Sequence, residues 1–419
     1  MPDSHRLRTL SGVIAVATAL TLAIPFAGSA SAATTAPTGP ATTDAADAAA
    51  GWLARQLVDG DHLTTAAGGA TYPNAGLTAD TVLALAAAGV GQDAAAKATA
   101  WLATPANLSG WIGDGTAESY AGSTAKAALV ALTQGQSPTS FGGVDLLTRL
   151  RGLEQTSGAE TGRFSDTSAY GDYSNTFGQS FAVIALERAD AAGASIAAVD
   201  YLAAQQCTDG GFRLDLAAGA GACASDPDAT ALAVQALLLA GRDDAASKGL
   251  DFLEGRQQAD GGVGGVGPTA GENANTTGLV AQALAAGERT DASAKAAAYL
   301  RGLQQGCAAT AGARGAIAYD ASGFVAGTAV AATTQAVLGL TGVGMATLNA
   351  SGASAEAPVL DCPGPATPAA SPTASVPAPA GATLPDTGST SGPLALLGVG
   401  LVLAGAALRW ATRHRGTHA

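Results

Sequence analysis

The hydrophobic positions of the chain repeat with a period close to 50 residues, from about residue 44 to residue 347. Each period holds one aromatic–leucine pair, and the starts of successive pairs lie 49, 49, 51, 51 and 47 residues apart. The pairs are Trp52-Leu53, Trp101-Leu102, Tyr201-Leu202, Phe252-Leu253 and Tyr299-Leu300, with Leu150 in the third period. A fixed period of this length predicts a stack of six similar supersecondary units.

Each unit predicts two helices. The first helix carries the aromatic anchor, as in residues 246–254, and the second is rich in Ala and Leu, as in residues 230–239. A glycine such as Gly241 follows the second helix, where a helix end favours a left-handed residue. We expect the Ala-rich helices to be the more buried set. Polar residues before the apolar runs are predicted to cap them: Asp80, Ser123, Asn175, Asp228 and Asn275.

The repeats define a domain at 44–349, preceded by a linker at 33–43. Residues 350–383 contain no repeat and are rich in Pro, Ala, Ser and Thr. Such a segment buries no core and is predicted to be a disordered, extended stalk. Cys362 lies near its start and is expected to tie the stalk to the sixth repeat.

The C-terminal end carries three elements in a fixed order: Leu384, Pro385, Asp386, Thr387 and Gly388, an apolar run at 393–411, and a basic tail at 412–419. This order resembles the cell-wall sorting signal of Gram-positive surface proteins. The resemblance implies that a sortase cuts between Thr387 and Gly388 and joins the chain to peptidoglycan. The apolar run is then a transient transmembrane helix, with the basic tail in the cytoplasm. The alternative is a plain single-pass anchor.

The N-terminal end predicts export. A basic stretch with Arg6 and Arg8 precedes the apolar residues 10–26, and Ala30-Ser31-Ala32 forms a small-residue cleavage site. Residues 1–32 are therefore predicted to be a signal peptide. Together, the two ends predict a protein displayed on the cell surface.

The charge of the body excludes some partners. Leaving out Arg6, Arg8, Arg409, Arg413, Arg415 and Asp3, the chain has 15 basic and 32 acidic residues. A body this acidic repels phosphate backbones and anionic lipids, so we expect no nucleic-acid partner.

The cysteines predict two disulfide bonds, because all four lie in the exported part of the chain. Four cysteines allow three pairings. We favour Cys207–Cys223 and Cys307–Cys362, since the first pair brackets one loop. A metal site is the alternative, but His62 is the one histidine of the repeat region, so no metal site or cofactor is predicted.

The repeat resembles the QW motif of the prenyltransferase and squalene-cyclase superfamily. Units four to six carry a glutamine four residues beyond the leucine of each pair, at Gln206, Gln257 and Gln304. Unit three keeps Gln155, whereas unit two has Ala106 at this position and unit one has Gln56 one place early. The resemblance implies an all-α fold, an α/α toroid with six inner and six outer helices. It also implies a central cavity, where family members bind isoprenoids, peptides or corrinoids.

One segment resembles the acidic motif of class II terpene cyclases, Asp-x-Asp-Asp-Thr-Ala, whose middle Asp protonates an alkene. Here Asp226-Pro227-Asp228-Ala229-Thr230-Ala231 places Asp228 at the position of that acid, but Ala229 replaces its acidic neighbour. Cyclases also stabilise carbocations with aromatic walls, and this chain is 5% aromatic. We favour a capping role for Asp228 over an acid.

A second candidate lies just before the third Ala-rich helix. Tyr170, Tyr173, Asn175 and Phe177 are close together in sequence, and the toroid interpretation places their loop near one mouth of the ring. Aromatic and polar groups side by side suit contact with a ligand or glycan. Ordinary loop packing is the alternative. Asp226, Asp228 and Asn275 complete the candidate residues of the cavity or rim.

The leading prediction is therefore a sortase-anchored, non-catalytic toroid that binds an unknown small molecule, peptide or glycan, or serves adhesion. The first alternative is an enzyme of the terpene-cyclase type with Asp228 as its general acid. The second is a corrinoid carrier. The third is a purely architectural ring with a filled centre.

Overall fold

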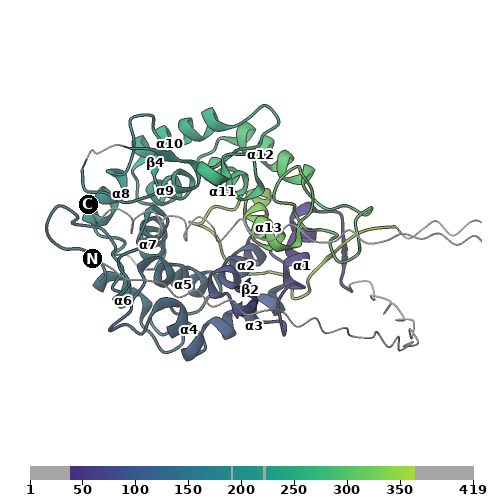
Figure 1. Ribbon diagram of the computed structural model, residues 1–419, viewed down its shortest axis with the longest axis horizontal. Helices are drawn as coiled ribbons and strands as arrows, with labels where there is room; N and C mark the ends of the chain where they lie inside the picture. The colour runs from purple at the N-terminus through teal and green to yellow at the C-terminus, as the bar shows by residue number, and fades with distance from the viewer. Residues whose placement is uncertain (1–37, 190–191, 220–222, 364–419) are drawn as a thin grey trace, which may run out of the picture. The chain divides into compact units, whose positions relative to one another are not determined.

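The computed structural model describes residues 38–189, 192–219 and 223–363, and these residues are mostly helical (Figure 1). Six Ala-rich helices lie around a centre: α2 (Ala75–Ala88), α5 (Ala121–Thr133), α7 (Thr176–Ala189), α9 (Pro227–Leu239), α11 (Ala274–Ala286) and α13 (Ala326–Thr341). Six anchor-bearing helices surround them: α1 (Ala45–Ala54), α3 (Gln92–Leu102), α6 (Leu146–Gly152), α8 (Ile196–Ala203), α10 (Asp243–Arg256) and α12 (Thr290–Gly302). The expected α/α toroid is confirmed.

The inner helices form a closed ring. Each packs against the next in chain order, and α13 packs against α2. Small residues let the backbones approach closely: a Cβ added to Gly278 of α11 would lie 2.3 Å from the carbonyl oxygen of Gln335 in α13. Between α5 and α7, a Cβ on Gly122 would lie 3.2 Å from the Cα of Gly178. The prediction that the Ala-rich helices are the buried set is therefore confirmed, and close backbone contact explains their composition.

Glutamine side chains connect successive units. Nε2 of Gln206, Gln257 and Gln304 each donates to one carbonyl in the following loop and to one in the next outer helix. The acceptors in the outer helices are Ala245 of α10 at 2.8 Å, Ala292 of α12 at 2.9 Å and Ala45 of α1 at 2.8 Å. The last bond joins the sixth unit to the first. It closes the outer ring with the same interaction that links its neighbours.

The third unit makes this connection with a different residue. The Nε2 of Gln179, in the inner helix α7, donates to the carbonyls of Gly162 and of Ala198 in α8. The second unit, which lacks the glutamine at Ala106, instead forms an additional helix, α4 (Pro105–Ile112). Arg149 of α6 then donates to the carbonyl of Gly113 at the end of α4.

The strands are short and lie outside the two rings of helices. β2 (Thr64–Ala67) and β3 (Ala70–Pro73) form an antiparallel hairpin, and β4 (Phe212–Arg213) pairs antiparallel with β5 (Ser225–Asp226). Near the chain ends, β1 (Ala41–Thr42) pairs in parallel with β6 (Val359–Leu360). One 3₁₀ turn covers Gly267–Thr269. These elements add to the helical fold without changing its class.

Residues 342–362, here called the floor strap, cross the C-terminal ends of the inner helices. Met345 and Leu348 of the strap are buried. Hydrogen bonds join Gln282 of α11 to Val343, Gln235 of α9 to Met345, Arg188 of α7 to Leu348, Thr133 of α5 to Ala350, and Gly89, which follows α2, to Ser354. Five inner helices therefore point their C-terminal ends in the same direction, and the strap covers the ring on that side.

The predicted start of the stalk at residue 350 is wrong, because residues 350–363 belong to the folded body. Arg55, directly after α1, donates to the carbonyl of Pro358 at 2.8 Å. The next two residues, Val359 and Leu360, pair with β1. The favoured disulfide pairings are confirmed: Cys207–Cys223 and Cys307–Cys362 have Cα–Cα distances of 5.5 and 5.4 Å. The second bond fixes the end of the floor strap to the sixth unit.

Several predictions concern residues outside the described ranges. These are the signal peptide at 1–32, the stalk from residue 364, the sorting motif at 384–388, the apolar run at 393–411 and the tail at 412–419. Among the residues that are described, no helix has the length and apolar character that crossing a membrane requires.

The junction of the sixth and first units depends on a glycine. Gly315 has φ of +91°, and a Cβ there would lie 2.6 Å from the carbonyl oxygen of Ala48 in α1. We expect Gly315→Ala to lower the free energy of unfolding by about 2 kcal/mol or more, because it adds backbone strain and a clash. Chemical denaturation measures this loss.

Gly352→Ala is the matched control. Gly352 has φ of +77°, and nothing lies within 4 Å of its added Cβ. This variant should lose only the strain contribution, about 1 kcal/mol. Equal losses in the two variants would contradict the role given to the contact between Gly315 and α1.

Candidate functional site

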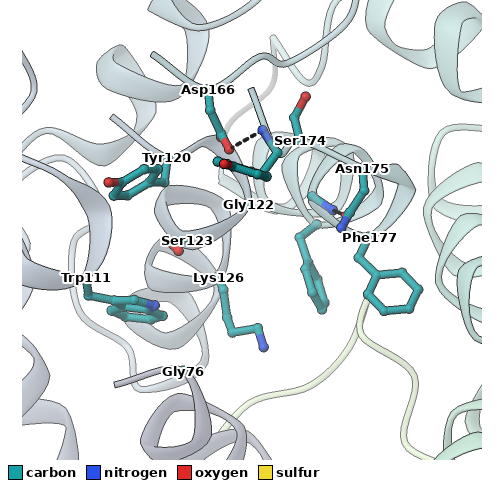
Figure 2. Close-up of a pocket in the computed structure, with 13 residues that line it drawn as sticks. Gly76, Trp111, Tyr120, Gly122, Ser123, Lys126, Asp166, Ser174, Asn175 and Phe177 are labelled. Carbon is teal, nitrogen blue, oxygen red and sulfur yellow. Dashed lines mark hydrogen bonds between the residues drawn. The ribbon is translucent and has the colours of Figure 1, made fainter. Parts of the chain in front are cut away.

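The N-terminal ends of the inner helices form the open mouth of the ring, opposite the floor strap. A pocket of about 360 Å³, here called the mouth pocket, lies there between α2, α5 and α7 (Figure 2). Its aromatic lining is Trp111, Tyr120, Tyr173, Phe177 and Phe181, and its polar lining is Ser123, Lys126, Asp166, Ser174 and Asn175. The mixture of flat apolar faces and hydrogen-bonding groups is typical of small-molecule sites.

The size of the residue at the second position of each inner helix determines where the mouth is open. This position is a glycine in α2 (Gly76), α5 (Gly122) and α13 (Gly327), and the first two line the pocket. In α7, α9 and α11 it is Phe177, Asp228 and Asn275. The absence of side chains on α2 and α5 leaves space on that side of the mouth, whereas larger side chains occupy the other side.

Lys126 brings a positive charge into the pocket. Its Nζ lies 2.7 Å from Oδ1 of Asp80 and 5.2 Å from the ring centroid of Phe181. Both partners of the ion pair are partly exposed, and Figure 2 shows the Lys126 side chain extending toward the pocket. The carboxylate and the aromatic face together hold the ammonium in place.

Asp166 organises the loops above the pocket. Its Oδ1 accepts the backbone N–H of Ala121 at 2.8 Å, at the start of α5, and its Oδ2 accepts that of Tyr173 at 3.3 Å. Burial raises the pKa of Asp166, and these backbone hydrogen bonds oppose the shift. The Tyr173 hydroxyl in turn donates to the carbonyl of Tyr170 at 2.8 Å.

The structure brings together three of the four residues in the predicted rim cluster. Tyr173, Asn175 and Phe177 line the mouth pocket, whereas Tyr170 does not and is strongly exposed. The predicted capping role of Asn175 is supported, because its Oδ1 accepts the N–H of Gly178 at 3.1 Å.

Four other predicted caps are wrong. Asp80 lies within α2 and Ser123 within α5, whose N-caps are Asn74 and Tyr120. Asp228 and Asn275 lie in the first turns of α9 and α11. The caps of these two helices are Asp226, which accepts the N–H of Ala229, and Asn273, which accepts that of Thr276.

Asp228 therefore has no capping role. Among the described residues, its Oδ1 is buried without a hydrogen-bond partner, and so is Oδ1 of Asn275 on the neighbouring helix. Burial raises the pKa of Asp228 to about 6, a hydrogen bond from Thr276 opposes the shift, and the charge of Asp226 adds to it. A carboxyl that is partly protonated near neutral pH is a group able to donate a proton. Asp228 does not line the mouth pocket.

Sequence reasoning missed Trp111, Tyr120, Lys126, Asp166 and Phe181. A signal for Lys126 was present, because it is the one charged residue in the Ala-rich stretch 121–133. Buried helices rarely carry an unpaired lysine. Trp111 had no comparable signal, since it belongs to the helix α4 that departs from the repeat.

Comparisons with known proteins show the fold. No family model matches this chain, and no curated protein matches it. The apo structure of the type II terpene cyclase MstE from Scytonema matches with a TM-score of 0.52 and 15% identity, over 71% of this chain and 96% of that one. The unsaturated glucuronyl hydrolase from Bacillus sp. GL1 matches with a TM-score of 0.51 and 12% identity, over 71% and 95%. At these identities the similarity establishes the α/α toroid alone.

The raised pKa of Asp228 predicts how stability changes with pH. At pH above about 6 the native state holds an ionised, buried carboxylate, whereas below pH 3.8 the group is protonated in both states. Stability should therefore fall as pH rises from about 4 to 6, by roughly 3 kcal/mol for this group. Asp228→Asn removes this cost. The unfolding free energy of the variant, relative to that of the wild type, should therefore be higher at pH 8 than at pH 4. Urea denaturation at the two pH values measures the difference.

Asp244→Asn, at an exposed position in the first turn of α10, is the control. Its effect on the free energy of unfolding should be small and similar at both pH values. If Asp228→Asn behaves in the same way as this control, the burial assigned to the Asp228 carboxyl is wrong.

Proposed function

We propose that this protein is a cell-surface module that binds an organic ligand in the mouth pocket of a closed toroid. The observation that carries the proposal is the pocket itself: about 360 Å³, with five aromatic side chains and an oriented lysine, on a ring whose other end is covered. Its size suits part or all of a small ligand. The space at the mouth speaks against a purely architectural ring, and its volume is too small to enclose a corrinoid macrocycle.

Display on the cell wall is the second part of the proposal. Its support is the order of segments in the sequence: an export signal at 1–32, a Pro-rich spacer from residue 364, the motif at 384–388, an apolar run and a basic tail. Sortase would be the processing partner, and peptidoglycan the attachment site. The spacer would then hold the binding domain away from the wall.

An acid-catalysed reaction at Asp228 is the second candidate function. The observation that favours it is the carboxyl whose pKa rises to about 6 and whose Oδ1 has no partner among the described residues. A variant of the similar cyclase MstE has been solved with geranylgeranyl dihydroxybenzoate as its substrate. In an enzyme of that kind, Asp228 would protonate an alkene, and Asp228→Asn would abolish turnover. Ala229 is the departure that weakens this candidate, because no acidic neighbour supports the proton donor.

The binding proposal is tested by filling the pocket. The Ser123 side chain lines it and makes no hydrogen bond within the described structure, so Ser123→Phe should block the space without breaking a side-chain hydrogen bond. We expect native mass spectrometry of residues 33–383 from the producing cell to show a co-purifying small molecule. Ser123→Phe should lose that mass, and Tyr170→Ala, outside the pocket, should keep it.

Two results would oppose binding at this site. One is a bound mass that persists unchanged in Ser123→Phe, which would place the ligand elsewhere. The other is a wild-type protein that carries no ligand and takes up none from a cell extract.

The anchoring proposal is tested at the predicted cut. Thr387→Ala removes the residue whose carboxyl would be transferred, so the protein should move from the cell-wall fraction to the membrane fraction. Thr390→Ala, beyond the cut, should remain in the wall. Immunoblotting of the two fractions measures the distribution, and a Thr387→Ala protein that stays covalently linked to the wall would show that the motif is not the sorting site.

A further inference from the structure

A second hollow adjoins the mouth pocket at the N-terminal end of α2. This hollow has a volume of about 390 Å³ and shares Gly76 and Trp111 with the mouth pocket. From there it extends past Asn107 and Trp101 to the β2–β3 hairpin, where Thr65 and Pro73 line it. Because Gly76 and Trp111 line both, the two hollows lie side by side with Trp111 at their junction, and together they are here called the groove.

The helix α4 forms one wall of the outer hollow. It is the additional helix that the twelve-helix ring does not need, and it supplies Asn107, Gly110 and Trp111. It occurs in the unit that lacks the connecting glutamine. The helix α4 departs from the regular repeat and places Trp111 between the two hollows. This favours a functional role for α4 over a role in ring stability.

The groove carries no net formal charge. No charged residue lines the outer hollow, and the mouth pocket balances Lys126 against Asp166, with the Lys126 ammonium already paired to Asp80. The chain as a whole has a net charge of −13. An anionic ligand would be repelled by the protein and would meet no free cation in the groove, so the lining fits a neutral ligand.

The outer hollow also suits a ligand rich in hydroxyl groups. Its polar groups are amides and hydroxyls: Asn74 donates to Thr65 at 2.7 Å, and Asn107 donates to the carbonyl of Trp101 at 2.9 Å. The indole N–H of Trp111 has no partner in the described structure and is free to donate. A purely apolar chain would leave the indole N–H of Trp111 without water or a partner, at a cost in free energy.

The aromatic surface of the outer hollow is held in place before a ligand arrives. The His62 ring stacks on Trp101 with centroids 4.8 Å apart and planes 8° apart. A fixed ring loses little conformational entropy on binding. Flat aromatic faces beside hydrogen-bonding groups match a sugar ring, whose C–H face is apolar and whose edge carries hydroxyls.

We infer that the groove binds a neutral glycan, several sugar rings long, that runs from the outer hollow across Trp111 into the mouth pocket. This inference rests on the proposed binding function and adds the class of ligand. A chain long enough to fill both hollows gains contacts that a short fragment does not make. The mouth pocket then holds one end of the glycan, and the outer hollow holds the rest.

Isothermal titration calorimetry on the full-length chain tests this with cellotetraose and tetra-N-acetylchitotetraose, together with their disaccharides. The two series distinguish plain from N-acetylated sugars. We expect one tetrasaccharide to bind at least tenfold more tightly than its disaccharide. Trp111→Ala should weaken binding of the tetrasaccharide at least tenfold. Asn107→Ala should reduce the affinity for the tetrasaccharide toward that for the disaccharide, and Tyr72→Ala, which lines neither hollow, should change nothing.

Equal affinity for tetra- and disaccharide, or full binding in Asn107→Ala, would overturn the extended groove. If neither glycan series binds while a co-purifying mass is still lost in Ser123→Phe, the glycan assignment is wrong and the mouth pocket remains a binding site. If that mass proves to be a peptide or a lipid, the ligand class inferred here is likewise wrong. If Trp111→Ala is misfolded by circular dichroism, Asn107→Ala and Ser123→Phe decide the question.

Discussion

Closure of the ring between the sixth and first units is the constraint on which the rest of the structure depends. Gln304 reaches the carbonyl of Ala45, Trp52 donates to the carbonyl of Gly312 at 2.8 Å, and Gly315 lies against Ala48. In an open stack, the end units would expose their packing faces and need caps. Here each face is covered by its neighbour, and the inner helices converge on a common centre. Three of these inner helices, α2, α5 and α7, line the mouth pocket.

The two ends of the ring differ because the floor strap covers only one of them. The floor strap bonds to the C-terminal ends of five inner helices, and the disulfide Cys307–Cys362 fixes its end. The other end presents helix N-termini, where the cap side chains of α2, α7, α9 and α11 each accept one backbone N–H. The small residues Gly76 and Gly122 leave space there, whereas Asp228 and Asn275 place unpaired oxygens on the opposite side. One mouth therefore combines an open pocket with a separate buried acid, and these two features support the two candidate functions.

Much of the fold could be predicted because the same hydrophobic pattern occurs in several units of the chain. The period, the two helices of each unit and the burial of the Ala-rich set all follow from it, and the bracketing of a loop by Cys207 and Cys223 favoured the correct pairing. Helix starts were harder, because two cap-forming residues lie close together in α9 and in α11. Pro227 could have settled the first case, since proline favours the first helical position and so makes Asp226 the cap. The error mattered, because it assigned Asp228 a structural role that the structure does not give it.

The site was less predictable than the fold, because it arises where the repeat is broken. Trp111 belongs to a helix that occurs in one of the described units only. Residues 350–362 lack the repeat pattern, although they bond to the C-terminal ends of α5 and α2 and to β1. The side chains that meet in the mouth pocket come from the first three units, and their proximity depends on how α2, α5 and α7 pack together. Sequence periodicity describes each unit but does not describe the space that six units enclose.

Coincident unfolding of distant units tests ring closure most directly. In residues 33–383 the tryptophans are Trp52, Trp101 and Trp111, all in the first two units, whereas far-UV circular dichroism reports every helix. A closed ring predicts that urea denaturation followed by the two signals gives a single, superimposable transition, and that Gln304→Ala in the sixth unit shifts both signals equally. Two separate transitions, or a Gln304→Ala protein whose tryptophan signal does not move, would show that the first and last units do not support each other and would contradict the closed ring.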